Sequence, residues 1–181
     1  MHRLRREEFF LKAAQSDIGL NEQFPNSQSI HFRSVSSVWK PWPRPANPGR
    51  VLSFLDCLLQ AVGPWETCWL YKGHGYWFTE LSPQMDLEDK IRSLHHAWLG
   101  LPAKCDDVLE ADSTETAHII SICYDSLMFG HTVWEDVIVI PQGGDAFFEV
   151  SHHNEVMVSA RNTKKLREIR KALLFKGFRP Y

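Results

Sequence analysis

The segment 134–178 constrains the fold more than any other part of the chain. It opens with four consecutive β-branched residues, Val137 to Ile140, which a proline follows, and such a run is typical of a strand buried on both faces. Two further apolar runs follow at residues 146–151 and 155–160. Because only short polar turns separate the three runs, the sequence predicts an antiparallel meander over residues 136–160.

The register of the second hairpin follows from parity. The alternate apolar residues of both strands can face the same core only if the two residue numbers of each cross-strand pair add up to an even number. A three-residue loop meets this condition and pairs Val150 with Val156, with Asn154 in the left-handed conformation that asparagine tolerates well. A loop shifted by one residue, with His153 in that conformation, is the alternative. The other face of both strands is half polar and is expected to be partly wet.

Two stretches have clear helix signals at both ends. Asn47 precedes a proline and a strong apolar face, so a capped helix is predicted over residues 48–62. The closing helix is expected to begin after Asn162 or Thr163 and to end at Gly177. One face of this helix is apolar, and the other carries Lys164, Lys165, Arg167, Arg170 and Lys171.

A further helix is predicted between Asp86, its cap, and Gly100. Its apolar residues recur at steps of four, three and four, the period of the stripe that a helix normally turns to a core. This stripe consists of Leu87, Ile91, Leu94 and Trp98. His95 borders the stripe and His96 lies farther round, so the two side chains diverge too far to grip one metal ion together.

A hairpin is expected at residues 65–80, because two runs rich in aromatic residues flank the turn Gly73-His74-Gly75. A three-residue loop at this turn opposes Leu70 to Phe78 across the two strands. Near the N-terminus, apolar residues with charged neighbours predict a short helix that ends at about Gln15.

Residues 105–112 show no clear period and are predicted to form a loop. Asp112 with Glu115 three residues later resembles a capping box, so a helix is predicted from there to Phe129. The isoleucines inside this stretch also favour strands, and a strand over residues 117–124 is the alternative.

The Trp- and Pro-rich segment at about residues 36–48 must be extended, because its alternate prolines hold the backbone near polyproline II. One interpretation is that the segment straps across its own domain and buries Trp39 and Trp42. The other is an arm that binds a partner through Trp39, Trp42 and Arg44, since Trp and Arg dominate protein interfaces.

Together, these elements predict one α+β domain over residues 1–181. We expect a single layered domain with a mainly antiparallel sheet of about five strands, formed by the hairpin 65–80 and the meander 136–160. About four or five helices should pack on this sheet. A hydrophobic content of 44% suits a full core.

Charge and composition narrow the range of partners. A net charge of −2 gives no bulk attraction to nucleic acid or to anionic membranes, so neither is expected as a partner. The N-terminus lacks the apolar centre of a signal peptide, and no run has the roughly 20 apolar residues needed to span a bilayer. The four cysteines lack CxxC spacing and are expected to be reduced thiols, so a soluble, cytoplasmic protein is predicted.

No cofactor and no catalytic residue are expected, because the sequence contains none of the common nucleotide-binding or hydrolase motifs. His152 and His153, with carboxylates nearby, are weak candidates for a metal site. Zinc needs three or four convergent ligands, and neighbouring residues on a turn diverge.

The remaining features favour a non-catalytic protein-binding module that neutralises or regulates another protein. Besides the Trp- and Pro-rich segment, its expected binding surface is an acidic belt formed by Asp86, Glu88, Asp89, Asp106, Asp107, Glu110 and Asp112. Small domains of this general build include bacterial immunity proteins, which is an analogy of architecture only. The alternatives are a small metal- or histidine-dependent hydrolase and a structural or regulatory subunit of a larger assembly.

Overall fold

The structure is a computed structural model that describes residues 1–20, 30–35, 38–72, 77, 83–101, 105–129, 136–151 and 153–180. A seven-stranded sheet lies at the centre of this described part. In chain order its strands are β1 (His2–Leu4), β4 (Val38–Pro43), β5 (Thr67–Lys72), β6 (Val108–Asp112), β7 (Val137–Pro141), β8 (Ala146–Ser151) and β9 (Glu155–Ala160). Across the sheet the order is β1-β6-β5-β7-β8-β9-β4, and all neighbouring strands are antiparallel.

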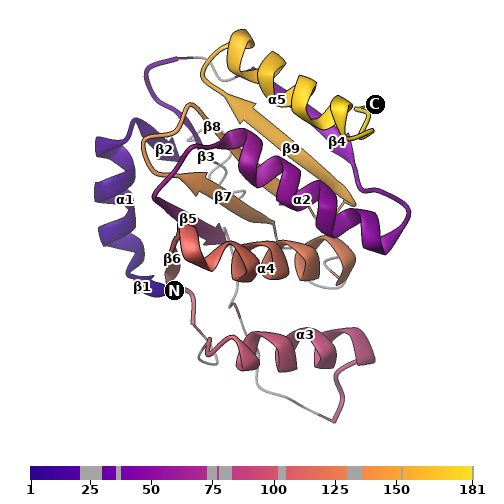
Figure 1. The fold of residues 1–181 in the computed structure, drawn as a ribbon. Coiled ribbons are helices and arrows are strands. Elements are labelled where there is room, and N and C mark those ends of the chain that lie inside the picture. The colour runs from indigo at the N-terminus through magenta and orange to yellow at the C-terminus, as the bar shows by residue number, and fades with distance from the viewer. Residues whose placement is uncertain are drawn as a thin grey trace.

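Other elements cover both faces of the sheet. The helices are α1 (Arg6–Gln15), α2 (Pro48–Val62), α3 (Leu87–Trp98), α4 (Thr116–Phe129) and α5 (Thr163–Phe175), with a 3₁₀ turn, η1 (Ser113–Glu115), before α4. Helices α2, α4 and α5 lie on one face, and α3 stands apart beyond α4 (Figure 1). Helix α1 and a small sheet of β2 (Ile18–Leu20) and β3 (Ile30–Phe32) cover the other face. Within the described residues, no helix is both long and apolar enough to cross a membrane.

Each face of the sheet has its own apolar core. Leu58 of α2 and Phe148 of β8 are fully buried in the core under α2, α4 and α5. On the other face, Phe9 of α1 stacks on Tyr71 of β5 with ring centroids 5.2 Å apart. Phe147 is also buried there, so the prediction of a partly wet face was wrong at this position. The cover comes from α1, β2 and β3, and the sequences of β2 and β3 carry no strong period.

The predicted meander is confirmed in β7, β8 and β9. Every residue of β7 is buried, as expected for a strand with both faces covered. Val150 lies opposite Val156, and Asn154 adopts the left-handed conformation with φ of 63°. The parity of the apolar positions was therefore a sufficient guide to the register.

The predicted pairing across the hairpin 65–80 was wrong at Leu70. This residue of β5 pairs with Leu109 of β6 on one side and with Val139 of β7 on the other, so no edge is left for Phe78. Phe78 itself and the turn 73–75 lie outside the described residues. Pairing between strands that are distant in the sequence therefore replaced the hairpin pairing that the local turn predicted.

Strand β6 lies where a loop was predicted. Glu110 interrupts its apolar residues and hides the pattern of a buried strand. Inside the sheet, however, the carboxylate of Glu110 accepts hydrogen bonds from Trp69 Nε1 at 2.9 Å and from Gln142 Nε2 at 2.8 Å. These partners offset the cost of placing a charged residue in an interior strand.

The Trp- and Pro-rich segment contains the edge strand β4, which pairs with β9 along its whole length. Trp42 is completely buried in the core, whereas the side chain of Trp39 lies outside the described part. The interpretation that this segment straps across its own domain is thus confirmed for Trp42. An edge strand tolerates prolines because one side of its backbone needs no partner.

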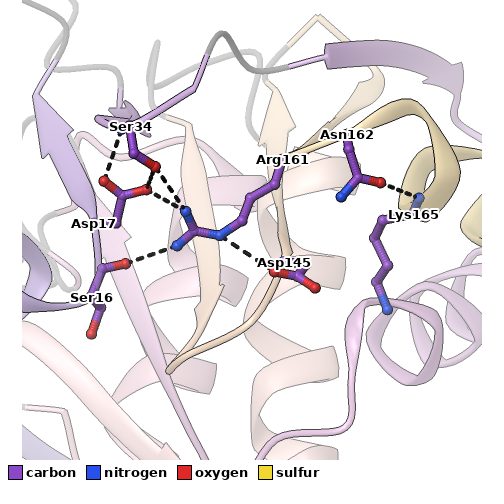
Figure 2. A network of polar contacts seen from close by, with 7 residues as sticks. All are labelled: Ser16, Asp17, Ser34, Asp145, Arg161, Asn162 and Lys165. Carbon is purple, nitrogen blue, oxygen red and sulfur yellow. Dashed lines mark hydrogen bonds and ion pairs between the residues drawn. The ribbon is translucent and has the colours of Figure 1, made fainter.

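Helix boundaries follow the predicted caps. Asn47 accepts a backbone hydrogen bond at the start of α2, and Asn162 accepts one from Lys165 N at 2.9 Å at the start of α5 (Figure 2). Asp112 and Glu115 form a complete capping box at η1. The following segment is the helix α4, so the strand alternative for residues 117–124 was wrong.

An arginine joins the N-terminal layer to the main sheet (Figure 2). Arg161, directly after β9, forms an ion pair with Asp17 and donates from Nη2 to the carbonyl oxygen of Ser16 at 3.2 Å. Its Nε lies 3.4 Å from a carboxylate oxygen of Asp145. Ser34 N donates to Asp17 at 2.8 Å, and hydrogen bonds from Ser34 and Arg161 lower the pKa of Asp17. This network holds together segments from both ends of the chain.

Candidate functional site

Helix α3 turns its polar side to the protein and its apolar side to solvent. Ser93 and His96 are buried, with 2% and 4% of their surface exposed. The predicted stripe is exposed at Leu87 (71%), Ile91 (44%), Leu94 (56%) and Trp98 (77%), and we call these four residues the α3 stripe. An apolar stripe of this period normally faces a core, whereas the α3 stripe faces solvent.

The polar side of α3 meets a carboxylate that α4 buries. Asp125 is 4% exposed and contacts the Nδ1 atom of His95. The other ring nitrogen of His95, Nε2, lies 2.7 Å from Ser121 Oγ. Since Ser121 and Asp125 are four residues apart on α4, both point to the same side of that helix.

His96 completes the contact between α3 and the body of the protein. Its Nε2 lies 3.6 Å from the same Asp125 oxygen, and its Nδ1 contacts the backbone carbonyl of Trp77. Trp77 is itself 2% exposed and donates from its indole Nε1 to the carbonyl oxygen of Asp107 at 2.6 Å. Two adjacent histidines thus join α3 to α4 and to the core.

This contact explains why the polar side of α3 faces inward. A buried carboxylate without partners costs several kcal/mol, and removing one partner from a buried pair is strongly destabilising. Burying one exposed leucine would gain only about 1.5–3 kcal/mol. The position of Asp125 inside α4 therefore selects the histidine side of α3, and the apolar stripe is left outside.

A chain of hydrogen bonds through His95 gives this contact a possible chemical use. When Nδ1–H donates to the Asp125 carboxylate, Nε2 is the acceptor for the hydroxyl proton of Ser121. This is the order of groups in a Ser-His-Asp triad. Ser121 also lines a shallow pocket of about 400 Å³ between α2 and α4, together with Leu52, Ser53, Asp56, Ala117 and Ile120.

The structure does not bring the predicted acidic residues into one belt. Asp86 is the exposed N-cap of α3 and accepts a hydrogen bond from Asp89 N at 2.8 Å, and the Glu88 side chain lies outside the described part. Asp106 and Asp107 follow the other end of α3, which is about 18 Å long. Asp86 and Asp89 lie at the N-terminal end of α3, next to Leu87 of the α3 stripe.

The other predicted binding residues lie away from α3. Trp42 is in the core, and Arg44 is half-buried with its Nη1 atom 3.1 Å from Met128 Sδ. His153 is exposed on the β8–β9 turn, and His152 lies outside the described residues. In the described part of the chain, no group of three or more His, Cys, Asp or Glu side chains is placed to hold a metal ion.

The cysteines are free thiols, and burial raises the pKa of Cys68 to about 12. Burial also raises the pKa of Cys123. Neither thiol is therefore activated as a nucleophile.

The contact between α3 and α4 was missed in the sequence, although one signal of it exists. Ser121, Asp125 and Ser126 interrupt a mainly apolar run, and a carboxylate in a helix buried on several sides needs a basic partner. The adjacent histidines of α3 are suitable partners, but only the fold shows that the two helices meet. Comparison of the chain with models of protein families, with curated proteins and with solved structures found no match.

Proposed function

We propose that this chain is a non-catalytic protein-binding module that binds its partner through the α3 stripe. The observation that supports this most is the exposure of all four apolar residues on one side of α3, from 44% at Ile91 to 77% at Trp98. Single exposed apolar residues are ordinary on protein surfaces, but a contiguous row of large ones marks an interaction site.

The spacing of the α3 stripe indicates how a partner would bind. Its residues follow the spacing of a helix that lies in an apolar groove of another protein. Trp98 stacks on His95, with ring centroids 6.0 Å apart and planes inclined by 25°. Because the histidines hold α3 in place, the stripe is presented without rearrangement, which lowers the entropic cost of binding.

The N-terminal end of the α3 stripe suggests the polar chemistry of the partner. Asp86 is exposed beside Leu87, and Asp89 lies in the same turn of the helix. A partner with an apolar groove and basic side chains at one end of it would complement this surface. Such charges speed association at low salt and lose their effect as salt rises. The free cysteines support a reducing, cytoplasmic location.

The direct test is affinity capture with the full chain from its native host, followed by binding measurements with the purified partner. The variant Leu87→Gln with Leu94→Gln makes the stripe polar and keeps good helix formers. The matched control is Phe175→Gln on α5, where the side chain is 88% exposed. We expect the wild type and the control to bind one basic-rimmed partner, and the α3 variant to lose it while remaining folded.

Two results would contradict this proposal. The first is a partner that binds the α3 variant as tightly as the wild type. The second is a dimer of the chain in light scattering that the α3 variant abolishes, because the stripe would then be covered by a second copy. A chain that is stable only within a larger assembly would favour the structural-subunit alternative.

A serine-dependent hydrolase is the second candidate, supported by the Ser121–His95–Asp125 contacts. In that reaction Ser121 Oγ attacks an ester carbonyl while its proton passes to His95 Nε2, and the ester C–O bond then breaks as the leaving alcohol takes that proton. A water molecule next attacks the acyl-enzyme and gives a proton to His95, which returns it to Ser121 as the acid leaves. The candidate ranks second because Ser121 lies inside α4, where its backbone N–H is bonded within the helix and cannot stabilise an oxyanion.

A fluorophosphonate probe separates this candidate from a purely structural contact. Labelling that Ser121→Ala abolishes and Ser53→Ala preserves would support the hydrolase, since both serines line the same pocket. Absence of labelling in the folded wild type would leave the contacts with a structural role only.

A further inference from the structure

A pocket between the β4–α2 turn and the end of α5 gathers three arginines. It has a volume of about 310 Å³ and is lined by residues 43–47, Arg50 and residues 177–179. The lining includes Arg44, Arg50 and Arg179, and none of the described residues that line it is acidic. Because distant segments supply these charges, the pocket is a product of the fold and is not evident in the sequence.

Two of the arginines are held in place. Arg50 donates from Nη2 to the carbonyl oxygen of Lys176 at 3.1 Å, and its Cζ lies 4.9 Å from the centroid of the buried Phe178 ring. Arg44 is half-buried, with its Nη1 atom 3.1 Å from Met128 Sδ. A guanidinium has five N–H donors, so each keeps donors for a ligand after these contacts.

Among the described residues, no carboxylate neutralises the charges of the three arginines. Within the described part of the chain, no acidic side chain forms an ion pair with Arg44, Arg50 or Arg179. Arg179 is exposed, and it directly follows Phe178, whose ring is anchored in the core. The pocket therefore combines three positive charges with few competing contacts.

The backbone dipoles around the pocket do not cancel the positive charge of the three arginines. Helix α2 begins beside the pocket and turns the positive end of its dipole toward it. Helix α5 ends there, but its last carbonyls are occupied: Gly177 N donates to Leu174 O and Phe178 N to Leu173 O, both at 2.9 Å.

A neighbouring pocket offers hydrogen-bonding groups. It has a volume of about 480 Å³, shares Arg50 and Phe178 with the first pocket, and is also lined by Ser53, Asp56 and Gln60. These side chains can accept and donate hydrogen bonds to hydroxyl groups. Together, the two pockets provide one cationic half and one polar half of a site.

We propose that these pockets bind a small phosphorylated ligand, with its phosphate between the three arginines and its hydroxyl-bearing part against α2. Guanidinium groups bind phosphate through paired, charge-assisted hydrogen bonds, which makes arginine well suited to this task. The three charges surround one pocket and do not follow a line, so a single phosphate fits them better than a nucleic-acid backbone does.

The test is calorimetric titration of the full chain with ribose 5-phosphate at fixed ionic strength, with ribose as the unphosphorylated control. We expect ribose 5-phosphate to bind and ribose not to bind. Arg50→Gln and Arg179→Gln should each weaken binding by about tenfold or more, since hydrogen bonds to charged groups are lost. Arg167→Gln removes an equal charge from the outer face of α5 and should change affinity by less than about twofold.

Three results would overturn the proposal. One is no binding of ribose 5-phosphate up to about 10 mM by folded wild-type protein. Another is an equal loss of affinity in all three variants, which would indicate bulk charge attraction only. The last is tighter binding of a DNA duplex that Arg167→Gln weakens, which would assign the basic surface of α5 to nucleic acid.

Discussion

Helices α2 and α3 are both amphipathic, yet they turn opposite sides to the protein. Six apolar residues of α2 are buried, and they lie over an apolar row of the central sheet. Helix α3 meets Asp125 and Ser121 of α4 instead, so its histidines face inward and its apolar residues face solvent. An apolar stripe therefore shows only that a helix has two unlike sides, and the surface that the helix meets decides which side is buried.

The largest expected difference between the two helices is in stability. Leu58 of α2 is completely buried, so Leu58→Ala should lower the free energy of unfolding by about 2–5 kcal/mol. Leu94 of α3 is 56% exposed, and Leu94→Ala should change that free energy by no more than about 0.5 kcal/mol. Urea denaturation of both variants measures this difference, and equal losses would show that α3 buries its stripe.

The polar contact under α3 should be the next largest effect. Asp125→Ala leaves His95 and His96 without their shared carboxylate and should lower the free energy of opening α3 by about 1–3 kcal/mol. Hydrogen exchange should then accelerate in α3 and remain unchanged in α2. Glu168→Ala, an exposed acid on α5, is the control. Unchanged protection of α3 in Asp125→Ala would contradict the anchoring role of this contact.

Glu149 of β8, a half-buried acid whose effective neighbours are the carboxylates Asp136 and Glu155, adds a dependence of stability on pH. Burial, the charge of Asp136 and the hydrogen bond with it, and the charge of Glu155 raise the pKa of Glu149 to about 8, above its ordinary value of 4.5. The folded protein therefore keeps the Glu149 proton between these two pH values, while the unfolded chain releases it. The stability that this proton contributes is complete below pH 4.5 and is lost as pH rises through 8.

Glu149→Gln tests this dependence because it cannot ionise. Its free energy of unfolding should fall less than that of the wild type between pH 5 and 8, as measured by urea titration at each pH. An identical pH dependence in both proteins would show that Glu149 is ionised in the folded state.

The smallest expected effect is on the rate of partner binding. Asp86→Asn with Asp89→Asn removes two charges beside the α3 stripe, and asparagine still caps a helix. Affinity for the partner should fall by about two- to fivefold at low salt, mainly through slower association. Stopped-flow association at two salt concentrations checks this, and an effect that persists at high salt would argue against electrostatic steering.

Local signals predicted much of the fold. The meander 136–160 and its register, the caps at Asn47 and Asn162, and the capping box at Asp112 all depend on a few neighbouring residues, and each was confirmed. Parity and capping are properties of short segments, so distant contacts do not change them.

Long-range pairing explains what the sequence did not show. Strand β5 is flanked by β6 and β7, and no local pattern identifies these neighbours. The sheet has seven strands, more than expected, and β1, β4 and β6 are the strands that were not predicted. Their sequences hide the strand pattern, because β1 is short, β4 carries prolines and β6 contains a charged residue. The arginine pocket and the α3–α4 contact arise in the same way, from residues that only the fold brings together.

Thiol reactivity reports directly on the orientation of α3. Leu94→Cys and Ser93→Cys place a thiol on adjacent residues, one 56% exposed and the other 2% exposed in the native side chains. We expect Leu94→Cys to react with a maleimide nearly as fast as in the unfolded chain, and Ser93→Cys to be strongly protected under native conditions. Protection of Leu94→Cys with rapid labelling of Ser93→Cys would contradict this orientation, because α3 would then bury its apolar stripe.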